Sequence, residues 1–405
     1  MPTPSRFHPE RLSALHRVLQ GYCERGDIPG IVALIARGDE QHVEVLGTKQ
    51  AGGREPMQRD TIFRVASITK PIAGAATMML IDEGKLQLDA AVDQWLPELA
   101  QRRVLRRLDS ELDDTVPAKR AITVRDVLTF CCGLGSVMAR PGTYPIQRPI
   151  REQRLGGDGP EYMLNPPSTD AWIRGIGELP LLHQPGERWL YNTSADLLGV
   201  LIARVTGKTF GEFLRERVFE PLGMHDTGFS VPADKRGRLP DCYAFDSEQQ
   251  RLTVFDSAEN SAWSRTPVFE SGAGGLVSTV DDYFAFCRMM LDKGRSGQRR
   301  LLSEAAVEAM TRDQLTPAQR EGTEIFLGKH ASWGFGVAVD IAADHDVPGT
   351  VPGRFGWDGG LGTSAYSDPK NDFVGILFTQ RLMDSPDPPP VFTDFWEHAY
   401  RALEG

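Results

Sequence analysis

Strand-type segments at both ends of the chain enclose a long helical stretch, and this arrangement limits the possible folds most strongly. Helical spacing over Pro9–Glu24 precedes two apolar runs, Ile31–Ala36 and Val43–Leu46, that are typical of a hairpin. Near the other end, three strand-like segments and a final helix follow one another: Trp333–Ile341, Gly362–Ser367, Phe373–Thr379 and Val391–Leu403. Such termini commonly join in one sheet, so we expect an α/β domain made from both termini, with an antiparallel sheet flanked by helices.

The middle of the chain is expected to form an inserted helical domain. Apolar residues recur with helical spacing in several segments: Ile72–Glu83, Val124–Thr129, Ala195–Val205, Phe210–Val218, Thr279–Leu291 and Ser303–Met310. Residues 137–185 are rich in Pro, Gly and Arg, and we interpret them as a long surface loop insertion, which is often functional. We therefore predict an α/β domain of residues 1–66 and 325–405, and a mainly helical domain of residues 67–324.

Composition excludes several classes of function. The chain has 45 Lys and Arg against 55 Asp and Glu, a net charge of −10, so it lacks the basic excess that a nucleic-acid surface needs. Its longest clean apolar run, Ile72–Ile81, is shorter than the roughly 20 residues of a membrane span. The five cysteines are scattered without a C-x-x-C, and the first residues form no apolar signal segment. We expect a cytoplasmic protein without nucleic-acid or membrane partners.

A serine followed three residues later by a lysine is the main candidate for a nucleophilic site. The pattern occurs at Ser67–Lys70 and at Ser367–Lys370, where Pro369 prevents a helix. Ser67 precedes an apolar helix, in which residues i and i+3 share a face, so the Lys70 ammonium can reach the Ser67 hydroxyl. The helix N-terminus also directs free N–H groups and a positive dipole at this spot. The pattern indicates an activated nucleophile, with an N-cap serine beside a surface lysine as the alternative.

The surroundings of Ser67 resemble the active-serine helix of penicillin-recognising serine hydrolases. That superfamily includes class C β-lactamases, D-alanyl carboxypeptidases and family VIII carboxylesterases. The resemblance is carried by these stretches: Phe63–Lys70, Asp82–Asp89, Ile122–Thr129, Pro185–Tyr191, Glu220–Met224 and Ser271–Leu276. It covers residues 28–380, is closest in motif pattern to the family VIII esterases, and implies a β-lactamase/transpeptidase-like fold.

The resemblance implies a role for each matching residue. Ser67 is the expected nucleophile, Lys70 its helical partner, and Tyr191 the tyrosine that relays the proton. The N–H groups of Ser67 and Gly360 are expected to form the oxyanion hole. Because a phenol beside an ammonium has a lowered pKa, we expect Lys70 and Tyr191 to share the work of the base. The alternative role for Tyr191 is that of a core aromatic.

Two departures from the β-lactamase pattern favour an ester substrate. Class C enzymes have Y-x-N, whereas Tyr191 is followed by Asn and Thr. In place of K-T-G, this chain has Trp357, Asp358 and Gly359, which we expect to bind substrate and which are similar to the family VIII variant. Asp358 is expected to repel an anion, although Arg354 or an arginine of residues 137–185 could supply the missing cation. The glycines are expected to let an edge strand approach the substrate closely.

The sequence predicts a serine hydrolase that acts through a Ser67 acyl-enzyme, most simply a carboxylesterase on small neutral esters with little or no β-lactamase activity. The alternatives are a class C-like β-lactamase, a D-amino-acid peptidase or amidase, and a non-catalytic protein that binds acyl ligands. A Ser-His-Asp triad also stays open, because its members need not be adjacent. The histidines show no zinc-binding spacing, and we expect no metal and no organic cofactor. The sequence leaves the oligomeric state open.

Overall fold

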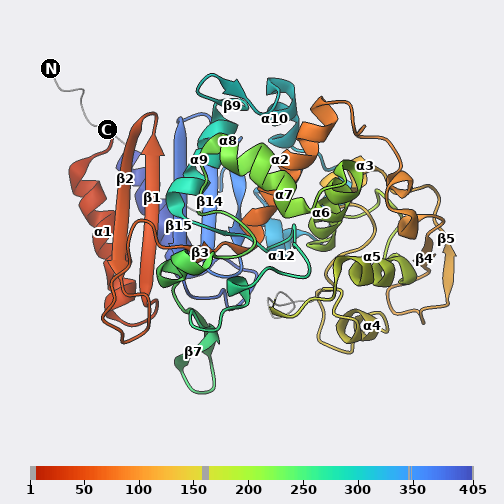
Figure 1. Ribbon diagram of the computed structural model, residues 1–405, viewed down its shortest axis with the longest axis horizontal. Coiled ribbons are helices and arrows are strands. Elements are labelled where there is room, and N and C mark those ends of the chain that lie inside the picture. The colour runs from red at the N-terminus through yellow and green to blue at the C-terminus, as the bar shows by residue number, and fades with distance from the viewer. Residues whose placement is uncertain (1–5, 157–163, 345–346, 348, 404–405) are drawn as a thin grey trace.

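The computed structural model describes residues 6–156, 164–344, 347 and 349–403. In these residues, seven antiparallel strands form the central sheet in the order β11-β12-β13-β14-β15-β1-β2 (Figure 1). The strands are β1 (Gly30–Arg37), β2 (Glu40–Gly47), β11 (Ala331–Trp333), β12 (Ala338–Asp340), β13 (Phe355–Gly359), β14 (Thr363–Asp368) and β15 (Phe373–Thr379). β1 pairs with β15 between Ile31–Thr379 and Arg37–Phe373. The expected fold class, with a sheet made from both ends of the chain, is therefore confirmed.

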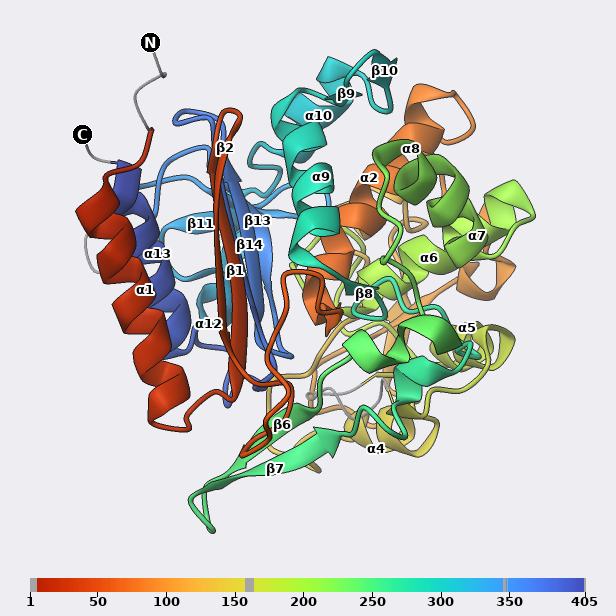
Figure 2. The ribbon, with the colours of Figure 1, turned by 60° about the vertical axis from the view of Figure 1, so that its left-hand side comes forward.

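Helices cover both faces of the sheet, which explains why its strands have continuous apolar runs. α1 (Pro9–Glu24) and α13 (Pro390–Leu403) lie side by side on one face, and α9 (Val280–Leu291) lies on the other (Figure 2). Successive residues of a strand point to opposite faces. Ile31 and Ala33 accordingly pack in the core beneath α1 and α13, while Val32 and Leu34 pack in the larger core on the opposite face.

The rest of the chain is mainly helical and lies beside the sheet (Figure 1). Its α-helices in the described residues, besides α9, are α2 (Thr69–Asp82), α3 (Val124–Leu128), α4 (Gln147–Glu152), α5 (Thr169–Glu178), α6 (Thr193–Thr206), α7 (Phe210–Leu214), α8 (Glu220–Leu222), α10 (Glu304–Met310), α11 (Pro317–Arg320) and α12 (Glu324–Leu327), and short helical turns such as η1 (Ala66–Ile68) accompany them. α2 is buried on every side from Thr69 to Leu80, as its uniformly apolar sequence requires. Among the described residues, no helix has the length and apolar character to cross a membrane.

Short two-stranded ladders accompany these helices. They are β3 (Phe63–Arg64) with β8 (Val277–Ser278), β4 (Arg103–Leu105) with β5 (Thr115–Pro117), β6 (Cys242–Asp246) with β7 (Arg251–Asp256), and β9 (Arg295–Ser296) with β10 (Arg299–Arg300). The predicted domain division, 1–66 with 325–405 against 67–324, stays a prediction. α9 belongs to the second range in sequence, yet it packs against the sheet.

The segment 333–341 forms two strands rather than the one strand expected from its sequence. β11 ends at Trp333, the chain turns, and β12 pairs back with it from Ala338. Gly336 lies in this turn with φ +80°, a conformation that glycine adopts at little cost. The turn also contacts α2, where a Cβ at Gly74 would lie only 2.5 Å from the Phe335 carbonyl oxygen. The glycines thus let α2 pack directly on the turn.

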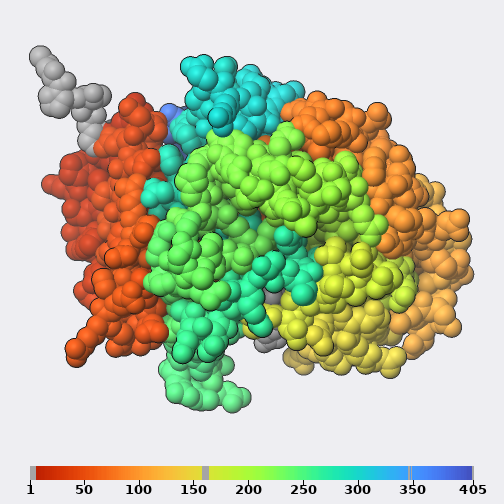
Figure 3. Space-filling view, in the orientation of Figure 1, coloured from red at the N-terminus to blue at the C-terminus, as the bar shows by residue number. Residues whose placement is uncertain are grey.

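The described part of residues 137–185 lies at the surface, as expected, but it contains more regular structure than a loop. It forms the yellow region at the lower right of Figure 3 and includes α4 and α5. The Ser168 hydroxyl caps α5 by accepting a hydrogen bond from the Ala171 N–H, and Trp172 and Ile176 are buried on its inner face. The sequence analysis missed this helix because it read the whole segment as a loop, although α5 itself has buried apolar residues at helical spacing. Residues 157–163 of the predicted insertion lie outside the described residues.

Candidate active site

Ser67 lies in η1, the turn that leads into α2, and the sheet fixes this turn from the side. The Thr363 hydroxyl of β14 donates a 2.8 Å hydrogen bond to the Val65 carbonyl oxygen. A Cβ at Gly359 would lie 2.5 Å from the same oxygen, so only glycine allows β13 to approach so closely. Ala66 has φ +47°, a conformation rare for residues other than glycine and often found at functional sites. The surroundings therefore determine the position of the Ser67 side chain.

The structure brings Ser67, Lys70 and Tyr191 together around one oxygen atom. The Lys70 Nζ donates to Ser67 Oγ at 2.8 Å, and the Tyr191 hydroxyl donates to the same oxygen at 2.8 Å. The Lys70 Nζ also donates to the Ala273 carbonyl oxygen at 2.6 Å, and it lies 4.4 Å from the centroid of the Tyr191 ring. Trp357 Nε1 donates to the Tyr191 oxygen at 2.9 Å. A hydrogen-bonded chain therefore runs from Trp357 through Tyr191 to Ser67.

Aromatic packing and backbone hydrogen bonds hold Tyr191 just before α6. Its ring stacks on Phe326 with 4.3 Å between centroids and on Trp189 with 5.8 Å. Its carbonyl oxygen accepts a 2.8 Å hydrogen bond from the Ser136 N–H. Asn192 follows with φ +83°, so the chain turns sharply between the tyrosine and the helix. The phenol hydroxyl is therefore held toward Ser67.

Burial shifts the pKa of Lys70 into the range where it acts as a base. Its side chain is 0% exposed, and this burial lowers the pKa of Lys70 to about 7, against the opposing charge of Asp196. Burial likewise raises the pKa of Asp196 to about 6. Asp196 accepts hydrogen bonds from the Ser271 hydroxyl at 2.6 Å and the Ala273 N–H at 3.1 Å. Asp196 thus holds the loop whose Ala273 carbonyl oxygen accepts the hydrogen bond from Lys70. The sequence analysis missed this role of Asp196.

The expected lowering of the Tyr191 pKa is wrong. Burial raises the pKa of Tyr191 to about 12, and the hydrogen bonds with Ser67 and Trp357 oppose this shift only in part. The expectation assumed a charged ammonium beside the phenol, whereas burial favours the neutral amine of Lys70. At neutral pH the phenol is therefore a proton donor, and the amine of Lys70 is the group able to accept the Ser67 proton.

We expect kcat/KM for ester hydrolysis to rise with pH and to level off above about pH 7. Only the neutral amine of Lys70 accepts a proton, so the rate falls about tenfold for each pH unit below its pKa. The measurement is a profile of kcat/KM for a neutral nitrophenyl ester from about pH 5 to 9, corrected for spontaneous hydrolysis. A profile that keeps rising toward the ordinary lysine pKa of 10.5 would contradict a neutral Lys70.

The three predicted substrate-binding residues are consecutive in β13, but their side chains do not face the same site. Trp357 points toward Tyr191, but Asp358 is the next residue of β13 and points to the opposite face of the sheet. There the Tyr366 hydroxyl donates to Asp358 Oδ2 at 3.4 Å, and burial raises the pKa of Asp358 to about 6. The charge of Asp358 nevertheless reaches the site, because it contributes to the raised pKa of Tyr191, so the repulsion of an anionic substrate stays a prediction. Gly359 instead contacts the turn before Ser67.

Arg354 is also turned away from Ser67, so it does not replace the missing cation of the β-lactamase motif. Its Nε donates to Asp340 Oδ2 at 2.7 Å. The guanidinium carbon lies 4.4 Å from the centroid of the Tyr366 ring and 5.0 Å from that of Trp396. Because Trp396 belongs to α13, Arg354 lies in the core beneath that helix.

β13 is not an edge strand along its whole length. β12 pairs with it at Phe355 and Gly356, so among the described residues the part from Trp357 onward has no pairing partner on that side. The expected open backbone thus exists only at the end of β13. Gly360 follows this end, and a Cβ there would meet no atom within 4 Å. That the N–H groups of Ser67 and Gly360 form the oxyanion hole stays a proposal.

The geometry favours a lysine–tyrosine pair over a histidine triad. The hydrogen bonds described for Ser67 Oγ come from Lys70 and Tyr191, and no histidine of the described residues takes part. In the same residues, no group of three or more His, Cys, Asp or Glu side chains is suited to hold a metal ion. This fold and this site define a serine hydrolase of the β-lactamase fold.

Comparison with known proteins gives the family. The chain belongs to the Beta-lactamase family, whose model matches residues 15–392. Protein Rv1367c of Mycobacterium tuberculosis is 37% identical to it, over 89% of this chain and 88% of the relative. Esterase EstB of Burkholderia gladioli is 30% identical, over 86% and 85% respectively. A solved structure described as "EstCE1, a hydrolase with promiscuous acyltransferase activity" superposes with a TM-score of 0.79 at 23% identity, covering 96% of this chain and 98% of that one.

Proposed function

We propose that this protein is a carboxylesterase that acts on neutral esters through an acyl-enzyme on Ser67. The observation that carries the proposal is the position of Ser67 Oγ, which lies 2.8 Å from both the Lys70 amine and the Tyr191 hydroxyl. A serine hydroxyl needs a neighbouring base to become a nucleophile, and the neutral amine of a buried lysine is such a base. The relationship to esterase EstB supports the same reaction class.

The proposed acylation moves one proton in its first step and two in its second. Lys70 takes the proton of the Ser67 hydroxyl as Oγ attacks the ester carbonyl, and the N–H groups of Ser67 and Gly360 stabilise the oxyanion. The carbon–oxygen bond to the alcohol then breaks, and Tyr191 donates its proton to the departing oxygen. The Lys70 ammonium, 4.4 Å from the Tyr191 ring centroid, returns a proton to the phenolate. Water releases the acid by the reverse steps, and an alcohol in place of water gives acyl transfer.

Two features of the site support an ester rather than a β-lactam. The lysine and threonine of the K-T-G motif are replaced by Trp357 and Asp358, and Asp358 points away from Ser67. Arg354 is held beneath α13. A β-lactam carboxylate would therefore lose a charge-assisted hydrogen bond, which is worth about 1.5–3 kcal/mol, or roughly tenfold to hundredfold in binding. A neutral ester loses nothing there and gains the indole ring.

We expect kcat/KM for nitrophenyl butyrate to exceed that for nitrocefin by about tenfold to hundredfold, because the carboxylate of nitrocefin lacks its usual cation. Both substrates are measured by absorbance at the same pH and ionic strength. The Ser67→Ala variant serves as the blank for each substrate. If nitrocefin is the better substrate, the protein is a β-lactamase and the esterase proposal fails.

We also propose a cytoplasmic location. All five cysteines are free thiols, and four of them are buried. Free thiols are typical of a reducing compartment, because an oxidising compartment favours disulfides.

A further inference from the structure

A cavity of about 430 Å³ begins next to Tyr191, within the segment that precedes α5. Asn192 and Thr193, which directly follow the tyrosine, line one end of it. The Ser136 N–H donates to the Tyr191 carbonyl oxygen at 2.8 Å, and Ser136 also lines the cavity. The volume is in the range of small-molecule binding sites. The cavity therefore lies beside the backbone of Tyr191, although Tyr191 itself is not among its described lining residues.

The wall of the cavity is apolar. It includes buried side chains that come from separate segments: Leu134, Val137, Ile146, Leu155 and Leu182. Burying an apolar group against such a wall is favourable in proportion to the area removed from water. The cavity is therefore suited to a bulky hydrocarbon or aromatic group.

Two arginines, Arg151 and Arg154, give the cavity a positive end. Both line it, and no Asp or Glu is among its described lining residues. In the described part of the chain, neither arginine has a carboxylate within ion-pair distance. Other arginines of the helical region do form ion pairs, for example Arg106, Arg107 and Arg188. The protein as a whole carries a net charge of −10, so this local excess of positive charge is unusual for it.

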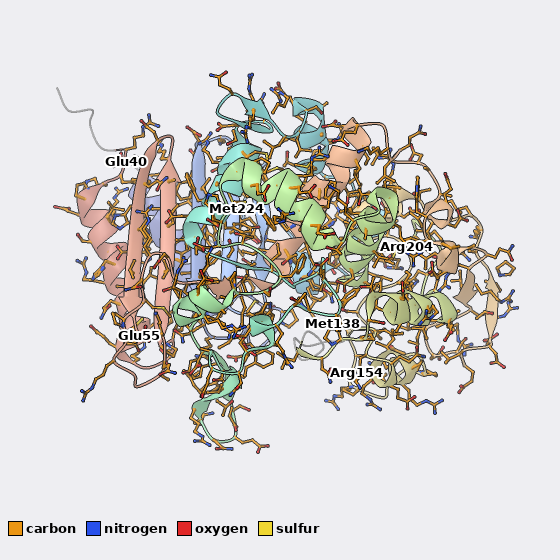
Figure 4. The ribbon with its side chains drawn as sticks, in the orientation of Figure 1. Glu40, Glu55, Met138, Arg154, Arg204 and Met224 are labelled. Carbon is orange, nitrogen blue, oxygen red and sulfur yellow. The ribbon has the colours of Figure 1, made fainter. Side chains whose placement is uncertain are left out.

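The backbone that carries these arginines is fixed rather than loose. The Arg154 N–H donates to the Arg151 carbonyl oxygen at 3.1 Å, and Arg154 adopts φ +55°. The Arg154 guanidinium donates to the Asn165 carbonyl oxygen at 3.3 Å. Trp172 Nε1 of α5 donates to the Leu155 carbonyl oxygen at 3.0 Å. Figure 4 shows Arg154 in the lower part of the view, near Met138 of the same segment.

The position of the cavity decides which half of an ester it would hold. In the proposed mechanism Tyr191 protonates the departing alcohol, so the alcohol leaves on the side of the tyrosine. The cavity begins at the residues that follow Tyr191. Because the cavity lies beside the tyrosine, we assign it to the alcohol half rather than to the acyl half.

We propose that this cavity binds the alcohol half of the substrate, and that this alcohol is bulky, apolar and ends in a carboxylate held by Arg151 and Arg154. The proposal rests on the proposed esterase function and names its substrate class. This changes the neutral ester of the proposed function in one respect: the acyl half stays uncharged, and the substrate carries a negative charge at the far end of its alcohol half. The same cavity receives the alcohol that accepts the acyl group when the reaction runs as a transfer.

Calorimetric binding tests the cavity independently of catalysis. The probes are 4-(4-hydroxyphenyl)butanoic acid and its primary amide, which have the same shape and differ in charge. Each is titrated into the Ser67→Ala protein and into the same protein carrying Arg151→Gln and Arg154→Gln. The matched control is Arg148→Gln, because Arg148 is an exposed arginine of the same helix that does not line the cavity.

The acid is expected to bind at least tenfold more tightly than the amide, in line with the usual effect of a charge-assisted hydrogen bond. The preference is expected to disappear in the double variant and to survive in the control. Equal affinity for both probes, failure of both to bind, or a preference that survives the double substitution would each overturn the proposal. If the double variant no longer binds the amide either, the ratio of acid affinity to amide affinity is measured in the Arg151→Gln and Arg154→Gln single variants, and the same criterion is applied there.

Turnover separates this proposal from the proposed function. The substrate is the butyrate ester of the same phenol, with either the acid or the amide at its far end, and the protein is the unmodified chain. If the acid-bearing ester is hydrolysed with a higher kcat/KM than the amide-bearing ester, both proposals are supported. A binding preference without hydrolysis of either ester contradicts the esterase function and leaves the carboxylate site in place.

Discussion

Replacing Ser67 by alanine is expected to reduce esterase kcat to background, a loss of about a millionfold, as in other enzymes that lose a nucleophilic serine. No other described hydroxyl lies in reach of both the Lys70 amine and the Tyr191 phenol. The fold should survive, because Ser67 does not cap α2. Ile68 stands at that position, and no side chain caps the helix. The sequence analysis left open that Ser67 is an N-cap residue, whose loss would weaken the helix. The structure contradicts this alternative.

The second S-x-x-K motif provides the control for this experiment. Ser367 lies in β14, 2% exposed, and Ser367→Ala should keep its activity. After treatment with a fluorophosphonate, mass spectrometry should find the adduct on Ser67 in the unmodified protein and in this control. More than a trace of activity in the pure Ser67→Ala protein would refute the nucleophile. No adduct in the unmodified protein would favour a non-catalytic, ligand-binding role.

Lys70→Ala and Tyr191→Phe are each expected to lower kcat by about 10²–10⁴, the usual contribution of a general acid or base. The double variant should be little worse than either single variant. The two groups handle the same proton, and residues that act as a unit are strongly non-additive. In the proposed mechanism Lys70 receives the serine proton and Tyr191 passes one to the departing alcohol, so losing either group is expected to stop the same relay.

Steady-state kinetics of the two single variants and the double variant test this cycle. Tyr283→Phe is the matched control, because this buried tyrosine donates to the Ile68 carbonyl oxygen at 2.8 Å but does not contact Ser67. Its effect on kcat should stay below about tenfold, since it removes only a neutral hydrogen bond. If the effects of Lys70→Ala and Tyr191→Phe multiply in the double variant, the two residues work independently and the proposed relay is wrong.

Much of the fold follows from the pattern of apolar residues. α1 begins and ends where the helical spacing predicts, at Pro9 and Glu24, and β15 matches the predicted Phe373–Thr379. Both elements carry a strong periodic or continuous apolar signal that their packing preserves. α5 escaped prediction because the residues around it are rich in Pro, Gly and Arg, although its own sequence carries a helix signal: an N-cap at Ser168 and buried apolar residues at helical spacing, Trp172, Ile173 and Ile176.

The meeting of Ser67, Lys70 and Tyr191 was predicted from motifs, but their electrostatics were not. The pKa of Tyr191 depends on how much water reaches the phenol, and no motif records this quantity. The direction of Asp358 was available from the sequence, because neighbours in a strand face opposite sides. Asp196 carried only a weak signal, an acid in the first turn of an apolar helix, which helix dipoles also favour.

The pairing of the first strand with the last sheet strand also limits when the protein can become active during its synthesis. Ile31 leaves the ribosome about 350 residues before its partner Thr379, a delay of roughly 20–70 s at about 5–20 residues per second. During this time the apolar β1 has β2 on one side and an unpaired edge on the other, which invites association with other chains. The turn that carries Ser67 likewise lacks its contacts with Thr363 and Gly359 until these residues have been synthesised. A nascent chain therefore carries Ser67 long before the contacts that position it can form, and its first hairpin keeps an open apolar edge until β15 has been made.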